Sequence, residues 1–141
     1  MSDRTAWSHD INLDDQPISA SQARSFVRRH LAGHGLAHLS DDVEVIVSEL
    51  ATNAIRHSQT PFTVSLQAFE RTLLLEVEDG SSAWRARVAP AHVLDTHGRG
   101  LAIVDLLCRD WGMAPLPDGG KSVWAEFTLP EQCNLRGRGV A

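Results

Sequence analysis

Two β-rich runs separated by two residues constrain the fold of this chain more than any other feature of its sequence. Residues 62–69 and 72–79 are dominated by β-branched, leucine and phenylalanine side chains, and Glu70 and Arg71 lie between them. A short polar connection between two such runs is typical of antiparallel neighbours. The sequence therefore predicts a β-hairpin in the middle of the chain.

The segment before the hairpin predicts one strand and two helices. Trp7, Ile11 and Leu13 alternate with polar residues, a pattern typical of an edge strand. A first helix is expected from Ser19 to about Gly33, with apolar positions at helical spacing: Ala23, Phe26, Val27 and Leu31. The second helix is expected to open at the N-cap residue Ser40, and Asp41 and Asp42 complement its dipole. Its apolar stripe is Val43, Ile46, Val47, Leu50, Ala51 and Ala54.

The segment after the hairpin predicts a long loop, a helix and two more strands. Residues 81–98 show no firm periodicity, and loops of this length are commonly functional or disordered. GRGLAIVDLL then predicts a helix directly behind two glycines, continuing to about Arg109. WGMAP and KSVWAEFTL read as strands joined by a turn at residues 117–120, and a disordered tail is expected at residues 131–141.

This order of elements favours an α+β two-layer sandwich, in which helices cover one face of a sheet. The chain has 141 residues, 43% of them apolar, which suffices for one compact domain and is too little for two of ordinary size. We expect that single domain at residues 1–130.

Charge and composition argue against several classes of protein. The net charge of −5, without clustered Lys and Arg, predicts no direct contact with nucleic acid. No run is long enough to span a membrane and no signal peptide opens the chain, so a cytoplasmic protein is expected. Cys108 and Cys133 lie 25 residues apart and form neither a CxxC pair nor a zinc site, so we interpret both as structural thiols.

Glu49 and Asn53 are the first candidate for chemistry. They lie four residues apart in the second predicted helix, so they project from one side, at the margin of its apolar stripe. A surface glutamate beside an ordinary helical asparagine is the simpler explanation. Asparagine is, however, a poor helix former, because its side chain competes for the backbone. Its position therefore keeps open the alternative that the pair marks a site.

Two glycine-containing motifs are the other candidates. Asp79 followed by Gly80 at a strand end is most often a turn, but such a carboxylate can also accept a hydrogen bond from an exocyclic amine such as that of adenine. Gly98 and Gly100 at the mouth of a helix leave backbone N–H groups and the positive end of the helix dipole free to bind phosphate. This is not the dinucleotide-binding pattern, because Ile103 stands where a glycine or alanine is required.

Two further patterns are rejected as sites. GGKS at residues 119–122 resembles the end of a P-loop, but the required first glycine falls on Pro115 and a strand-like run follows. His30, His34 and His38 are spaced at four-residue intervals, but the intervening glycines break the helix that would align them as metal ligands.

The ordered set of motifs ELATNAIRH, VEDGS, GRGLAIV, WG and GKSVW resembles the GHKL superfamily of histidine kinase-like ATP-binding domains. Within it, the set is most similar to the actinobacterial anti-sigma regulatory factors, which are related to the anti-sigma factor serine kinases. The resemblance covers about residues 18–130. It implies the Bergerat-type ATP-binding fold, with a mixed, mostly antiparallel sheet and helices on one face.

The resemblance also assigns roles to residues of this sequence. It implies that Asn53 ligates a Mg²⁺ that bridges the nucleotide phosphates, and that Glu49 is the general base for an acceptor serine. Asp79 would read the adenine amine beside Gly80, residues 81–98 would form the lid over ATP, and Ser122 is a weaker match to a hydroxyl that supports the aspartate through water. The second glycine box would be Gly98, Arg99, Gly100 and Leu101.

Two departures from the superfamily pattern concern the glycine boxes. The first box is Asp79, Gly80, Ser81, Ser82, Ala83 where the superfamily has DxGxG, and the second has Ala102 in place of a third glycine. Both changes leave fewer flexible positions at the ends of the lid. They bear on nucleotide affinity and lid closure, and they leave the base and the metal ligand in place.

Two functions of different classes follow from this resemblance. The first is an anti-sigma regulatory factor that binds a sigma factor and acts as a serine/threonine protein kinase, a transferase, on a STAS-type anti-sigma antagonist. The second is a nucleotide-dependent module that sequesters a sigma factor or other partner with little or no phosphotransfer. Glu49 favours the first and the shortened glycine boxes favour the second. A homodimer is expected from the family only, and a histidine kinase fragment is disfavoured because residues 1–40 hold no pair of dimerisation helices.

Overall fold

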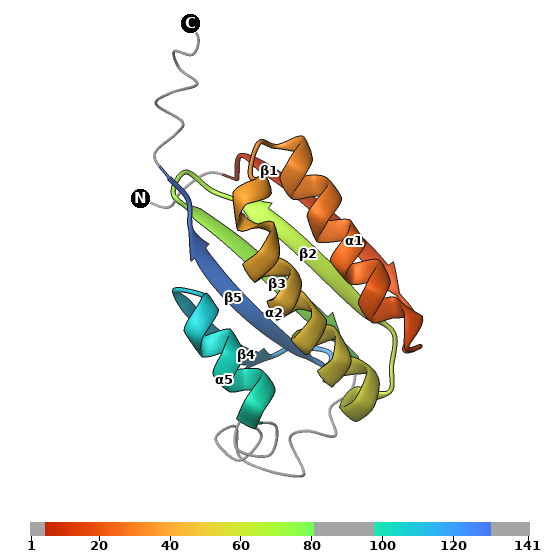
Figure 1. Cartoon of the computed structure of the whole chain (residues 1–141). Coiled ribbons are helices and arrows are strands. Elements are labelled where there is room, and N and C mark those ends of the chain that lie inside the picture. Colours follow the sequence, from red (N-terminus) through yellow and green to blue (C-terminus); the bar gives the residue numbers. More distant parts are fainter. Residues whose placement is uncertain (1–4, 81–97, 131–141) are drawn as a thin grey trace, which may run out of the picture.

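The computed structural model describes residues 5–80 and 98–130, with the side chains of residues 98–101 excepted (Figure 1). Nearly all of the predicted lid, residues 81–97, and the predicted tail, residues 131–141, lie outside the described residues. Within the described part, no helix is both long enough and apolar enough to cross a membrane.

A five-stranded antiparallel sheet forms one layer of the molecule. Its strands are β1 (Trp7–Leu13), β2 (Phe62–Ala68), β3 (Thr72–Asp79), β4 (Asp110–Pro115) and β5 (Lys121–Thr128). They lie in the order β1-β2-β3-β5-β4, and all four pairings are antiparallel. The predicted hairpin is β2 and β3, and β1 lies at an edge as expected. The resemblance implied a mixed sheet, but no parallel pair occurs among the described strands.

Within the described part of the chain, three helices cover one face of this sheet (Figure 1). They are α1 (Ile18–Gly33), α2 (Ser40–Asn53) and α5 (Gly98–Leu107), with a 3₁₀ turn η1 (Ala37–Leu39) before α2 and a π-helical turn η2 (Ala54–Ser58) after it. Alternate residues of β2 and β3 are buried, as are the apolar stripes on α1 and α2. The α+β two-layer fold class is therefore confirmed.

The predicted N-cap of α2 is wrong by one residue. Ser40 is already helical, with φ −61° and ψ −42°, and is the first residue of α2 rather than the residue before it. The turn η1 runs directly into α2, so Leu39 takes the capping position and makes no side-chain capping bond. The Ser40 hydroxyl instead donates to the Glu44 carboxylate one turn along the helix.

Cys108 follows α5 and behaves as a structural thiol. Its Sγ donates to the carbonyl of Val104 at 3.1 Å, and burial raises the pKa of the thiol. A raised thiol pKa leaves less of the reactive thiolate at neutral pH. Cys133 lies outside the described residues.

A histidine cluster joins the edge strand β1 to the end of α1. His9 stacks on His30 with ring centroids 3.8 Å apart, and its Nε2 lies 3.0 Å from Nε2 of His34. The indole of Trp7 stacks on His34 with a centroid separation of 3.9 Å. His38 lies on η1 outside this cluster, so the regular spacing of the helical histidines does not correspond to a shared site. Burial, followed by the nearby His9, lowers the pKa values of both His30 and His34.

The cluster predicts that folding stability falls in mild acid. Because the folded state lowers the histidine pKa values, the unfolded chain takes up protons first as pH drops through the ordinary value of 6.5. The stability that the neutral histidines contribute is fully present above pH 6.5. It is lost as the pH falls towards the lower pKa of the folded state. Urea unfolding measured from about pH 7.5 to about pH 5 should show the loss. Changing His30 and His34 to glutamine should flatten the pH profile.

Candidate functional site

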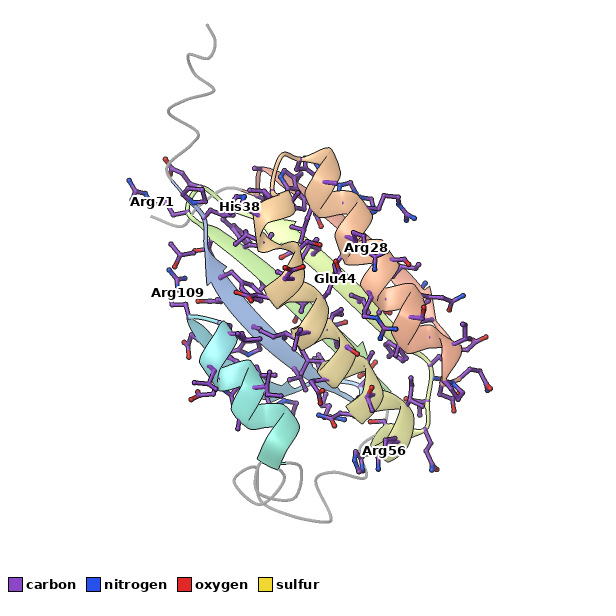
Figure 2. The ribbon with its side chains drawn as sticks, in the orientation of Figure 1. Arg28, His38, Glu44, Arg56, Arg71 and Arg109 are labelled. Carbon is purple, nitrogen blue, oxygen red and sulfur yellow. The ribbon has the colours of Figure 1, made fainter. Side chains whose placement is uncertain are left out.

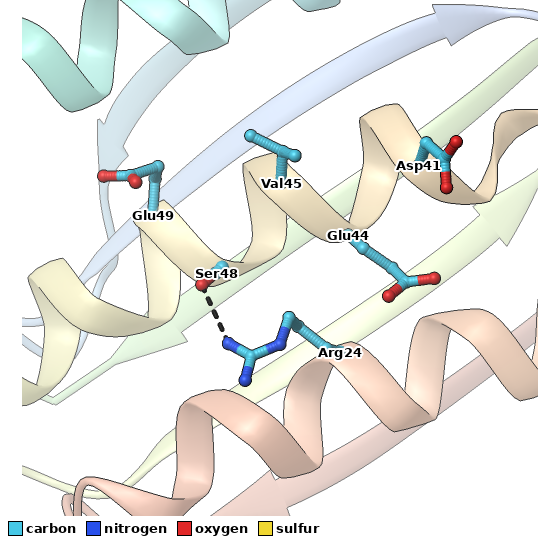
Figure 3. A pocket seen from close by; sticks show the side chains of 6 residues that line it. All are labelled: Arg24, Asp41, Glu44, Val45, Ser48 and Glu49. Atoms are coloured by element: carbon cyan, nitrogen blue, oxygen red, sulfur yellow. Dashed lines mark hydrogen bonds between the residues drawn. The ribbon is translucent and has the colours of Figure 1, made fainter.

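The end of α2 carries the predicted base and the predicted metal ligand. Glu49 and Asn53 lie one turn apart and are both half-buried, and Asn53 is the last residue of the helix. The chain then widens into the π-helical turn η2, which ends at Gln59 with a left-handed φ of 57°. Single π-turns within helices are frequent at functional sites. In Figure 3, Glu49 projects from the side of α2 that faces away from α1.

A buried ion pair joins the ends of β3 and β5 directly beside this turn. Asp79 and Lys121 are opposite one another in the register, and the Lys121 Nζ donates to Oδ2 of Asp79 at 2.7 Å. The same Nζ donates to the Ser58 Oγ of η2 at 2.7 Å. The side chains of Asp79 and Lys121 are only 2% and 9% exposed. These bonds therefore fix the predicted adenine-reading carboxylate to the turn that follows Asn53.

Lys121 is the residue of this site that sequence reasoning missed. It stands inside GGKS, a run that resembles the end of a P-loop. The available signal was the alternation of β5, in which Lys121, Val123, Ala125 and Phe127 occupy the face that packs against the helices. A lysine at the buried end of such a face requires an acidic partner, because an unpaired buried charge is costly.

Ser122 is a predicted site residue that the structure separates from Asp79. It lies one position beyond Lys121, so its side chain is on the opposite face of the sheet from Asp79. Its hydroxyl donates to Oε2 of Glu76 at 2.6 Å. Burial and the nearby Glu76 raise the pKa of Glu78 on that same face. The predicted support of Asp79 by Ser122 is therefore a wrong interpretation, and Lys121 takes that place.

Two glycines shape the backbone next to Asp79. Gly80 donates its N–H to Oγ1 of Thr60 at 3.2 Å, which ties the end of β3 to the segment that follows η2. Gly120 passes so close to the sheet that an added Cβ would lie 1.9 Å from the carbonyl oxygen of Asp79. The missing side chain of Gly120 thus allows the main chain to approach the end of β3 closely.

Gly120→Ala should destabilise the protein by about 1–3 kcal/mol, the usual cost of overpacking, because the obstructing atom belongs to the backbone and cannot turn away. The loss should appear as a lower denaturation midpoint in urea. Gly33→Ala is the matched control: Gly33 ends α1 with open space around it, so this change should be neutral or slightly stabilising. Equal effects of the two changes would contradict the proposed close approach.

The start of α5 supplies the predicted phosphate-binding end of the site. The helix begins at Gly98 itself, so the glycines of GRG lie within its first turn rather than before it. The N–H groups of this turn have no partners within the helix. Figure 1 shows that the first turn of α5, the last turn of α2 and the adjoining ends of β3 and β5 lie at the same end of the molecule.

A separate hollow of about 460 Å³ lies along α2, with Arg24 of α1 as its lining residue from the neighbouring helix. It is lined by Arg24, Asp41, Glu44, Val45, Ser48 and Glu49 (Figure 3). Arg24 donates to the Ser48 hydroxyl at 3.0 Å, and Arg28 of α1 points at Glu44 of α2, with Nη2 2.9 Å from Oε1 (Figure 2). Of the predicted site residues with described side chains, Glu49 alone lines this hollow, whereas Asn53 and Asp79 do not.

The fold and the site together define a class of protein: a helix-covered antiparallel sheet with Glu49 and Asn53 at a helix end and Asp79 at a strand end. The sequence of residues 13–127 matches the family described as the histidine kinase-like ATPase domain, and the chain belongs to that family. The GHKL superfamily named from the motifs is thereby confirmed. No protein of curated function is similar enough in sequence to match.

A solved structure with the same fold contains the RsbU and RsbW domains of Rv1364c from Mycobacterium tuberculosis. The two are 19% identical, and the TM-score is 0.66. The likeness covers 89% of this chain but only 34% of that one, so this chain spans about a third of the length of its structural neighbour. At this identity the likeness shows the fold.

Proposed function

We propose that this chain is an ATP-binding anti-sigma regulatory factor that acts as a serine/threonine protein kinase on a STAS-type antagonist protein. The observation that carries the proposal is the position of Glu49 and Asn53 at the end of α2, directly before the turn η2. Ser58 of that turn accepts a hydrogen bond from Lys121, which also donates to Asp79. Family membership supports ATP as the ligand. The RsbW domain in the structural neighbour supports the anti-sigma assignment by analogy of fold.

The donor set fits magnesium that arrives with the nucleotide. Mg²⁺ prefers oxygen ligands and keeps several waters, and the Asn53 amide oxygen supplies one such ligand. Within the described residues, no group of three or more His, Cys, Asp or Glu side chains could hold a metal ion by itself. The bound ion would neutralise charge on the phosphates. Asn53 would hold it, and the N–H groups at the start of α5 would bind phosphate oxygens.

Glu49 is the proposed general base for transfer to serine. Its carboxylate accepts the proton of the antagonist's serine hydroxyl while the serine oxygen bonds to the γ-phosphorus. The bond from that phosphorus to the bridging oxygen breaks, and ADP leaves with the electron pair. Phosphoryl transfer depends mainly on position and on neutralised charge, so one base, one amide ligand and backbone donors form a sufficient set.

The competing function is a module that binds ATP and sequesters a sigma factor without transfer. The shortened glycine boxes favour it, because they leave fewer flexible positions at the lid ends. Incubation with γ-labelled ATP, Mg²⁺ and STAS proteins, followed by mapping of phosphoserine, separates the two functions. Label on an antagonist serine supports the kinase. ATP binding without label under the same conditions supports sequestration.

Asn53→Ala should reduce the gain in ATP affinity that Mg²⁺ provides by roughly 10–100-fold, the range typical of disturbed metal ligation. Calorimetric titration with ATP in Mg²⁺ and in EDTA measures this gain. Asn12→Ala is the matched control, because Asn12 lies on the edge strand β1, where its Oδ1 accepts a hydrogen bond from the Thr63 hydroxyl. A full Mg²⁺ dependence in the Asn53 variant would remove that residue from the metal site.

A further inference from the structure

We propose that Lys121 is a specificity-determining residue of the nucleotide site, and that its ammonium donates a hydrogen bond to a ring nitrogen of the bound base. Asp79 beside it would accept a hydrogen bond from the exocyclic amine of the same base. This inference rests on the proposed function, since it assigns a further contact within the same nucleotide site.

The number of donors on Lys121 carries the first step of the argument. A lysine ammonium has three N–H donors and no acceptor. Two of them are used by Oδ2 of Asp79 and Oγ of Ser58, each at 2.7 Å. Among the described residues, no third acceptor is found for the Lys121 Nζ, although Lys121 is only 7% exposed. A buried donor left without a partner is costly, so the third N–H indicates an acceptor on a ligand.

The position of the ammonium is fixed rather than flexible. Lys121 is the first residue of β5 and faces Asp79, the last residue of β3, across the sheet. Ser58 holds the same nitrogen from the turn η2. Three separate elements therefore hold one donor, and a donor held in this way discriminates between ligands better than a mobile side chain does.

The chemistry of the pair matches one edge of adenine. A carboxylate and an ammonium side by side offer an acceptor next to a donor. Adenine offers the complementary arrangement, because its exocyclic amine donates and the adjacent ring nitrogen N1 accepts. With an apolar residue at position 121, the site would read the amine alone.

The test compares three nucleotides on the unaltered protein by calorimetry in Mg²⁺. ATP and 7-deaza-ATP both retain N1, so they should bind with similar affinity. In 1-deaza-ATP a C–H group replaces N1, and we expect binding to weaken by roughly 10–100-fold, the effect of losing one hydrogen bond to a charged donor. Equal binding of 1-deaza-ATP and ATP would overturn the inference while leaving the proposed function standing. Failure of ATP itself to bind would overturn both.

Lys121→Met provides the second measurement. The variant should bind ATP more weakly than the unaltered protein and should no longer distinguish ATP from 1-deaza-ATP. Tighter binding of ATP by the variant would show instead that Lys121 blocks Asp79, and would overturn the inference. Circular dichroism checks folding, and if the variant does not fold, the comparison of nucleotides on the unaltered protein decides alone.

Discussion

Replacing Glu49 with glutamine should slow phosphoryl transfer to the antagonist serine by about 10²–10⁴-fold, the usual contribution of a positioned general base. Glutamine keeps the size of the side chain at the end of α2 but cannot accept the serine proton. ATP affinity should stay unchanged, because other groups bind the nucleotide in the proposed site. Asp79 binds the adenine, and Asn53 and the start of α5 bind the phosphates with their metal ion. The measurement is the initial rate of phosphoserine formation from labelled ATP, with nucleotide affinity determined in parallel.

Glu44→Gln is the control for this experiment. It removes a carboxylate from the same helix, but Glu44 pairs with Arg28 of α1 and lies outside the proposed nucleotide site. Transfer by the Glu44 variant should match that of the unaltered protein. Undiminished transfer by the Glu49 variant would show that another group removes the proton. A loss of ATP binding in that variant would show that Glu49 contributes to binding rather than to the chemical step.

Local sequence patterns predicted most of the fold correctly. The alternation in β2 and β3 and the short link at Glu70 and Arg71 predict the hairpin, because each strand buries alternate residues against the same helices. The apolar spacing of α1 and α2 likewise gives their buried stripes. The prediction for Ser40 was wrong by one residue because the turn η1 runs directly into α2. The path of the chain between the two packed helices, rather than the capping preference of serine, decides where α2 begins.

The candidate site was predictable only where its spacing is local. Glu49 and Asn53 are one helical turn apart, so their proximity follows from helix geometry alone. The contact of Asp79 with Lys121 joins residues far apart in the chain and depends on the register of β3 against β5. A register shifted by one residue would place Ser122 on the helix-covered face instead of Lys121. The sequence alone therefore does not tell which of these two residues contacts Asp79.

The buried pair predicts the largest stability effect in the molecule. Lys121→Met should lower the free energy of unfolding by about 3–5 kcal/mol, the usual cost of removing one partner of a buried ion pair. The Asp79 carboxylate would stay at 2% exposure without the ammonium, and Ser58 would lose its donor. Urea denaturation followed by circular dichroism measures the change.

The double variant Lys121→Met, Asp79→Leu separates the cost of an unpaired charge from the value of the pair itself. Replacing both charges with apolar side chains of similar volume is often neutral or stabilising, so the double variant should recover most of the lost stability. Arg28→Met, which removes a pair whose arginine is 57% exposed, should have a much smaller effect. If the double variant is stable but no longer binds ATP, the pair is retained for ligand recognition rather than for folding. If instead it is as unstable as the single variant, the pair itself stabilises the junction of η2, β3 and β5.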